Sequence, residues 1–212
     1  MNPVLEQIQQ LALVPVVVLN DANDAKPLAQ ALCNGGLPCA EVTFRTDAAE
    51  ESIRIMTAEF PDMLIGAGTV LTIDQVDRAT AAGAKFIVSP GFDPEVVSYC
   101  IEKEIPIMPG AITPSEVIQI VKAGLETVKF FPAEAAGGLN MIKSLAAPFP
   151  TLKFMPTGGI NAKNISDYLK FDKIIACGGS WMVQPSMIAE QKFTEIENLT
   201  REAVNAAQAV RS

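Results

Sequence analysis

One lysine stands in a stretch whose other residues are those of a buried strand. Lys129 lies within Thr127–Phe131, with Val128 before it and two phenylalanines after it. A lysine is almost never fully buried unless it is paired, and burial disfavours the charged form of the amine. A neutral amine attacks a ketone and condenses with it to a Schiff base. The stretch therefore makes Lys129 a candidate for an imine-forming lysine. The alternatives are a structural ion pair or a side chain that extends from the strand end into water.

A second stretch, residues 40 to 46, carries two opposite charges. Side chains of a strand alternate between its two faces, so Glu41 and Arg45 share one face and Val42 and Phe44 share the other. In a barrel the helices cover the apolar outer face, which turns the charged face toward the interior or the mouth. A charge buried there must be paired, so Glu41 and Arg45 must pair with each other, with Lys129 or with a ligand. A carboxylate beside an imine-forming lysine can move protons, and an arginine is suited to binding a carboxylate.

Paired glycines lie at the ends of the last two expected strands. Gly158 and Gly159 follow one of them, and Gly178 and Gly179 precede Ser180 at the end of the other. Glycine pairs after the seventh and eighth strands of a barrel commonly bind phosphate, because bare N–H groups and a helix N-terminus face the anion there. The alternative is a pair of tight turns that use glycine for its positive φ.

A proline ends each of four successive apolar stretches, at Pro90, Pro109, Pro132 and Pro156. Proline cannot donate to a strand ladder, so it ends pairing and leads the chain into a loop. The four prolines either only end strands or form rigid loops around one shared mouth. Because barrel sites are built at the carboxyl ends of the strands, the two interpretations are compatible.

Histidine is absent from the 212 residues. Its absence excludes Ser-His-Asp and Cys-His catalysis and every His-ligated metal site. Any proton transfer must then use a carboxylate, Lys, Tyr, Cys or water. The 4 cysteines are scattered without a CxxC pair, which favours neither a disulfide framework nor a zinc site and suits a reducing compartment.

The chain carries 16 Lys and Arg against 24 Asp and Glu, a formal net charge of −8. This charge argues against nucleic acid and anionic membranes as partners, although the local field of a pocket can still attract an anionic small molecule. The first residues, MNPVLEQIQQ, lack a basic leader, and the apolar run Leu11–Leu19 is far shorter than the ~20 residues that span a bilayer. We therefore expect a cytoplasmic protein with no membrane partner.

Eight short apolar stretches alternate with helix-like segments along the chain. They are rich in Val, Ile and Phe and are bounded by Gly or Pro, as buried parallel strands are. The expected strands are Leu13–Leu19, Cys39–Phe44, Leu64–Val70, Phe86–Ser89, Ile105–Met108, Thr127–Phe131, Lys153–Met155 and Lys173–Cys177.

The segments between these strands carry helix signals, such as Thr113 with Glu116, which fit a capping box. Residues 1–10 indicate an extra helix before the first strand, and about Ile188 to Val210 a long final helix. This alternation favours the α/β class and a single (β/α)8 TIM barrel domain over residues 1–212, with an extra N-terminal helix. A doubly wound open sheet is the alternative, because alternation alone does not separate the two folds.

Seven strings of the sequence, taken together and in order, resemble the family of 2-keto-3-deoxy-6-phosphogluconate (KDPG) aldolase, also called 4-hydroxy-2-oxoglutarate (KHG) aldolase. The resemblance covers nearly the whole chain. The strings are EVTFRT (41–46), GAGTV (66–70), SPG (89–91), IPIMPG (105–110), VKFFPAE (128–134), PTGGI (156–160) and GGSW (178–181).

The resemblance implies a class I aldolase on a (β/α)8 barrel that needs no metal or other cofactor and is usually a homotrimer. By this resemblance, Lys129 matches the Schiff-base lysine and Glu41 the general acid and base. Further matches give substrate-binding roles to six residues. Arg45 and Thr69 match positions around the substrate carboxylate, and Phe131 matches the pocket wall. Pro90 and Gly110 match mouth loops, and Thr157 also matches a substrate-binding position. The matches for the phosphate end are Gly158, Gly159, Gly178, Gly179 and Ser180.

The reaction that the resemblance implies is cleavage of 2-dehydro-3-deoxy-6-phosphogluconate to pyruvate and glyceraldehyde 3-phosphate. The same family cleaves 4-hydroxy-2-oxoglutarate to pyruvate and glyoxylate. Two alternatives are a sugar-phosphate isomerase or epimerase on a similar barrel, and a non-catalytic barrel that binds a sugar phosphate. Neither of them needs an imine-forming lysine, so borohydride reduction in the presence of pyruvate separates them from an aldolase.

Overall fold

The computed structural model describes residues 2–211, and short apolar runs within them form eight strands. All strand residues except Lys153 are buried. The crossover helices cover the outer face of these parallel strands, so most strand residues are apolar. The buried polar exceptions are Glu41 and Thr43 in the second strand and Thr127 and Lys129 in the sixth. The strands are β1 Leu13–Val17, β2 Cys39–Thr43, β3 Leu64–Gly68, β4 Ile87–Val88, β5 Ile107–Met108, β6 Thr127–Phe130, β7 Lys153–Pro156 and β8 Cys177–Gly179.

Helices occupy the segments between the strands, as the alternation predicts. The Thr113 hydroxyl accepts the Glu116 N–H and the Glu116 carboxylate accepts the Thr113 N–H, which confirms the predicted capping box. None of the helices in the described part of the chain has the length and apolar character that crossing a membrane requires. They are α1 Pro3–Leu11, the 3₁₀ helix η1 Ala22–Asp24, α2 Ala25–Asn34, α3 Ala49–Glu59, α4 Ile73–Ala81, α5 Pro94–Glu102, α6 Pro114–Lys122, α7 Gly138–Ala146, α8 Ile165–Leu169, α9 Pro185–Ala189 and α10 Phe193–Arg211.

The strands pair in parallel and form two ladders. Six strands follow the order β5-β4-β3-β2-β1-β8, and β6 pairs with β7 in a separate ladder. Between the two ladders lie isolated parallel bridges, among them Gly110 to Lys129 and Thr157 to Gly178. The predicted α/β class is confirmed, whereas one continuous eight-stranded ladder is not present in the described residues.

Several strand predictions are too long. The predicted strands Phe86–Ser89 and Ile105–Met108 shorten to the two residues of β4 and of β5. Pro106 and Pro109 flank β5, and because neither has an N–H to donate, they limit its pairing. The predicted strand Lys173–Cys177 is wrong for most of its length, since β8 begins only at Cys177.

Two further predictions need correction near the C-terminus. Gly178 and Gly179 lie inside β8 and not in a turn after it. A Cβ at Gly178 would collide with the Thr157 hydroxyl, so the close approach of the two strands requires glycine there. The predicted helix from Ile188 to Val210 is two helices, α9 and α10, because Gln191 between them has a φ of 54°, which a right-handed helix cannot continue.

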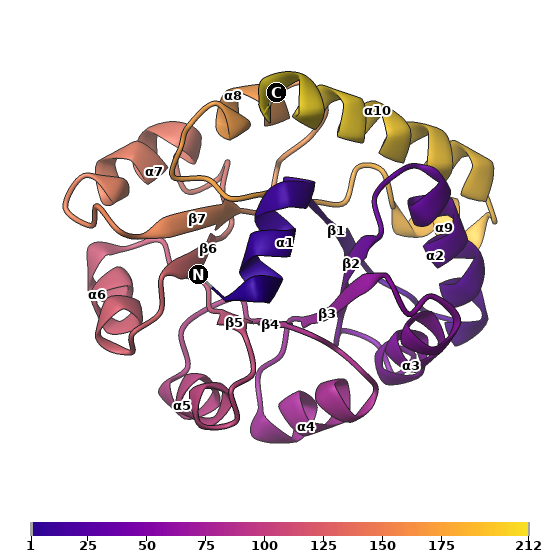
Figure 1. Cartoon of the computed structure of the whole chain (residues 1–212), viewed down its shortest axis with the longest axis horizontal. Coiled ribbons are helices and arrows are strands. Elements are labelled where there is room, and N and C mark those ends of the chain that lie inside the picture. The colour runs from indigo at the N-terminus through magenta and orange to yellow at the C-terminus, as the bar shows by residue number, and fades with distance from the viewer. Residues whose placement is uncertain (1, 212) are drawn as a thin grey trace.

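Figure 1 shows the strands near the centre of the molecule, surrounded by α2 to α8 and α10. Helix α1 crosses in front of the strands and leads directly into β1, so the helix predicted over residues 1–10 is confirmed for its described part. Apolar side chains from Ile8 to Ala207 form one connected buried core. Helix α1 lies at the amino end of β1, and the carboxyl ends of the parallel strands lie at the opposite end of the molecule.

Candidate active site

Lys129 on β6 and Glu41 on β2 meet in the interior, although their strands are not neighbours in a ladder. Lys129 Nζ donates a hydrogen bond to Glu41 Oε1 at 3.1 Å. Lys129 is 4% exposed and Glu41 is fully buried. The Phe131 ring presents its face to the same Nζ, which lies 5.3 Å from the ring centroid. Removing two charges from water is costly, so a pair buried this deeply calls for a functional explanation.

Glu41 has room for its carboxylate because a glycine faces it. A Cβ at Gly68 on β3 would collide with that carboxylate. Glu41 Oε1 accepts the bond from Lys129, whereas Oε2 is buried and has no hydrogen-bond partner among residues 2–211. Buried polar atoms are nearly always paired, so an unpaired carboxylate oxygen indicates a group that bonds to a bound molecule. It can also accept a proton from one.

We predict that Gly68→Ala destabilises the chain by about 1–3 kcal/mol, the usual cost of overpacking a buried site. The new methyl group would occupy the space of the Glu41 carboxylate. Thermal unfolding followed by circular dichroism measures the effect. Gly91→Ala is the matched control, since a Cβ at Gly91 meets no atom within 4 Å. Equal Tm values for the two variants would contradict the close packing at Gly68.

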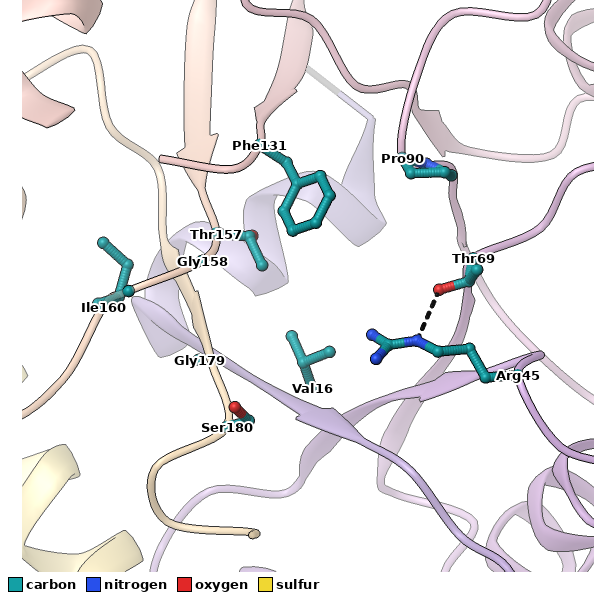
Figure 2. A pocket seen from close by; sticks show the side chains of 11 residues that line it. Val16, Arg45, Thr69, Pro90, Phe131, Thr157, Gly158, Ile160, Gly179 and Ser180 are labelled. Atoms are coloured by element: carbon teal, nitrogen blue, oxygen red, sulfur yellow. Dashed lines mark hydrogen bonds between the residues drawn. The ribbon is translucent and has the colours of Figure 1, made fainter. Parts of the chain in front are cut away.

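A cavity of about 340 Å³ opens beside the ion pair, at the carboxyl ends of the strands. Figure 2 shows the Arg45 side chain extending into it from beyond β2, opposite Phe131. Arg45 Nε donates to Thr69 Oγ1 at 3.3 Å. This bond fixes the arginine while its two Nη groups make no hydrogen bond within residues 2–211. An arginine held in this way can bind a carboxylate with two parallel hydrogen bonds.

Thr69 has a left-handed backbone, with a φ of 55°. A β-branched residue rarely adopts this conformation, because Cβ approaches the backbone closely. Residues held in such strained conformations cluster at functional sites, where the surrounding structure determines them. The backbone of Thr69 thus marks the same cavity wall as the Arg45 side chain.

Three consecutive peptide N–H groups lie on another wall of the cavity. Gly158, Gly159 and Ile160 all line it. The first two have positive φ values of 98° and 81°. Within the described residues, none of these three N–H groups donates to a protein acceptor. Successive free N–H groups in a turn form a concave binding site for an anion.

The carbonyls of the same turn are all occupied. In a trans peptide the C=O and N–H point in opposite directions, so a bound carbonyl fixes where the following N–H points. The bonds are Ala133 N–H to Thr157 O at 2.8 Å, Glu134 N–H to Gly158 O at 3.1 Å, and the Asn161 and Asn164 side-chain amides to Gly159 O at 3.0 and 3.1 Å. The three N–H groups are therefore oriented away from these partners before any ligand binds.

Most of the site residues predicted from the sequence line this one cavity. They are Arg45, Thr69, Pro90, Phe131, Thr157, Gly158, Gly159, Gly179 and Ser180. Lys129 and Glu41 are outside the lining and adjoin the cavity through the Phe131 ring. The structure therefore places the predicted chemical pair and the predicted binding residues next to each other.

Two predicted residues lie behind the cavity wall. A Cβ at Gly110 would collide with the Pro90 carbonyl, and one at Gly178 would collide with the Thr157 hydroxyl. Both glycines thus allow a lining residue to sit where it does, and neither lines the cavity itself. Gly110 and Gly178 act on the cavity through Pro90 and Thr157.

The cavity has two lining residues that sequence reasoning missed, Val16 on β1 and Ile160. Val16 lies opposite Glu41 in the register of β1 and β2. Because β1 is apolar on both faces, its sequence carries no signal for the side that faces a ligand. The signal that could have found Val16 is its position opposite Glu41, and using it requires β1 to be aligned with β2 first.

Comparisons with known proteins match nearly the whole chain to one family. The family model for KDPG and KHG aldolase matches residues 4–199. The 2-dehydro-3-deoxy-phosphogluconate aldolase of Haemophilus influenzae is 46% identical over 202 residues, which is 95% of this chain and 95% of that protein.

Two solved structures extend the comparison to the fold. KDPG aldolase from Legionella pneumophila, with pyruvate captured at low pH as a covalent carbinolamine intermediate, has a TM-score of 0.90 and 41% identity and covers 94% of this chain and 97% of its own. The aldolase of Zymomonas mobilis with 3-phosphoglycerate has a TM-score of 0.89 and 39% identity, and 97% of each chain is covered. A match of this extent in sequence and structure shows that the chain belongs to the KDPG and KHG aldolase family.

Proposed function

We propose that this chain is a class I aldolase that cleaves 2-dehydro-3-deoxy-6-phosphogluconate to pyruvate and glyceraldehyde 3-phosphate through a Schiff base on Lys129. The observation that carries the proposal is the buried 3.1 Å contact between Lys129 Nζ and Glu41 Oε1 beside an open cavity. A sugar-phosphate isomerase, or a barrel that only binds a sugar phosphate, would need no amine at this position.

The first half of the reaction forms the imine. Glu41 takes a proton from the Lys129 ammonium, and the neutral amine attacks the C2 ketone of the substrate. Glu41 then returns a proton to the carbinolamine hydroxyl, which leaves as water and produces a protonated imine. The amine and the carboxylate already lie within hydrogen-bonding distance, so neither has to move far for these transfers.

The second half breaks the carbon–carbon bond. Glu41 accepts the proton of the C4 hydroxyl, the C3–C4 bonding electrons flow into the imine, and glyceraldehyde 3-phosphate leaves. The pyruvate enamine that remains takes a proton at C3 and becomes the imine of pyruvate. Water attacks this imine, pyruvate is released, and the Lys129 amine is restored. Glu41 Oε2, which has no partner among the described residues, is the oxygen available for the C4 proton.

The two ends of the substrate fit the two polar walls of the cavity. We place the substrate carboxylate on Arg45 and Thr69, where the guanidinium supplies charge and the hydroxyl a further hydrogen bond. We place the phosphate on the free N–H groups of Gly158 and Gly159, with Gly179 and Ser180 beside them. The same carboxylate end would hold 4-hydroxy-2-oxoglutarate, which we propose as a second substrate.

We further propose that residues 1–212 form one (β/α)8 barrel domain and that three copies assemble. The isolated bridges between the two ladders and the single connected core support a closed ring. Five large apolar side chains that are 37% to 54% exposed support an assembly. They are Leu71, Ile73, Ile101, Ile118 and Val121. The free cysteines fit the reducing cytoplasm expected from the sequence.

Borohydride reduction in the presence of pyruvate tests the proposed function. Reduction of the imine should attach a pyruvyl group to the chain, and peptide mass spectrometry should locate it on Lys129. The control is borohydride without pyruvate, which should leave the mass of the chain unchanged. A chain that gains no mass with pyruvate, or gains it on another lysine, would refute the proposed chemistry.

A further inference from the structure

Tyr168 on α8 makes a hydrogen bond that the reaction does not use. Its buried hydroxyl donates to Glu134 Oε1, in the loop between β6 and α7. Burial raises the pKa of Tyr168, and the Glu134 carboxylate raises it further, so the hydroxyl remains a donor across the working pH range. The bond links two segments that are 34 residues apart in the sequence.

Glu134 also touches the turn that we propose for phosphate. Its N–H donates to Gly158 O at 3.1 Å. Its side-chain stem lies directly against Gly159, since a Cβ at Gly159 would be 2.6 Å from both Cβ and Cγ of Glu134. A rotation of the Glu134 side chain would therefore displace the turn or lose contact with it.

The other end of the bond leads back to the same turn. Asn164, the residue before α8, donates its side-chain amide to Gly159 O at 3.1 Å, and Tyr168 follows one helical turn later. The Tyr168–Glu134 bond thus joins the Glu134 backbone, which binds Gly158 O, to the helix that follows Asn164, one of the two side-chain amides on Gly159 O. A Cβ at Gly138, in the first turn of α7, would be 3.0 Å from Glu134 Oε1, so the carboxylate lies by that helix N-terminus, where a negative charge is stabilised.

We infer that Tyr168 and Glu134 are positioning residues for the substrate phosphate. They hold the two peptide planes that follow Gly158 and Gly159, so that the N–H groups of Gly159 and Ile160 point into the cavity. The inference rests on the proposed function, because it assumes a phosphorylated substrate. It extends that function by naming residues outside the cavity wall that determine how tightly the phosphate end binds.

Two reactions of the same enzyme separate this role from a merely structural one. Cleavage of 2-dehydro-3-deoxy-6-phosphogluconate uses the phosphate, whereas deuterium exchange into the methyl group of pyruvate needs the imine and the proton transfers but no phosphate. For Tyr168→Phe we expect KM for the phosphorylated substrate to rise about 10-fold, the effect of losing one hydrogen bond to a charged group. The exchange rate should change by less than about 2-fold in the same variant.

The chain contains a matched control, because its only other tyrosine also bonds to a carboxylate. Tyr99 on α5 donates to Asp77 Oδ1 at 2.6 Å, away from the cavity. Tyr99→Phe should leave both reactions unchanged. At the other partner, Glu134→Gln keeps an oxygen that can accept the Tyr168 bond, so its KM should rise less than that of Glu134→Ala.

Two results would overturn the inference while the proposed function stands. One is an unchanged KM in Tyr168→Phe, and the other is an equal loss in cleavage and exchange, which would indicate a general packing role. Failure of the proposed function is recognised separately, in the unsubstituted chain, which would then neither cleave the substrate nor exchange pyruvate protons. That result would overturn both.

Discussion

Lys129→Arg should abolish cleavage of 2-dehydro-3-deoxy-6-phosphogluconate, with a fall in kcat of at least about 10⁴-fold, the scale seen when a nucleophile is removed. A guanidinium stays charged at any working pH and does not condense with a ketone. The substitution retains a positive charge near Glu41, so a loss of activity reports loss of the imine and not loss of the charge. Pyruvate release, followed with a coupled dehydrogenase, measures cleavage.

A second lysine provides the control for this variant. Lys143 on α7 also lies over a phenylalanine ring, with its Nζ 5.8 Å from the centroid of Phe171, but it is exposed on the outside of the molecule. Lys143→Arg should retain full activity and should still gain a reduced pyruvyl group on Lys129. Substantial cleavage by Lys129→Arg would mean that Lys129 serves only as a structural partner of Glu41.

Glu41→Gln should fold and lose turnover by roughly 10²- to 10⁴-fold, the usual contribution of a positioned acid or base. Glutamine has the same shape and can still accept the hydrogen bond from Lys129 Nζ, but it cannot take up a proton. Because Glu41 serves every proton transfer in the scheme, cleavage and pyruvate deuterium exchange should fall together. This pattern differs from the one expected for Tyr168→Phe, in which only the phosphorylated substrate is affected.

The surface offers a matched lysine–glutamate pair for comparison. Lys26 Nζ and Glu59 Oε2 are 2.7 Å apart, and both side chains are about half exposed. Glu59→Gln removes the same charge from the same kind of pair, so it should change neither activity nor fold, since an exposed pair contributes little. Near-normal turnover by Glu41→Gln would instead exclude Glu41 as the acid and base.

The two residues of the buried pair were predictable because each is out of place in its strand. A lysine among Val and Phe at 129, and a glutamate in an apolar strand at 41, conflict with local burial, and such conflicts mark functional sites. The start of a helix was equally predictable from sequence, since Thr113 and Glu116 bind each other's backbone N–H groups without help from distant residues. These signals require no knowledge of distant segments.

Other features depended on contacts that the sequence does not display. The lining role of Val16 comes from its register opposite Glu41, and β1 is apolar on both faces. Gly110 and Gly178 are glycines because of what lies against them, the Pro90 carbonyl and the Thr157 hydroxyl. Their strings suggested binding residues, whereas packing between neighbouring strands explains them. The predicted strand lengths were wrong for the same reason, because the pairing partners of a strand decide where it ends.

The pairing of β1 with β8 has a consequence for synthesis of the protein. Val16, near the start of the chain, and Ser180, near its end, line the same cavity. Contacts so distant in sequence form slowly, because a long loop must close first. On the ribosome, a nascent chain whose last strand is still inside the exit tunnel has an unpaired edge on β1 and lacks one wall of the cavity. The cavity is therefore complete only after β8 has emerged and paired with β1.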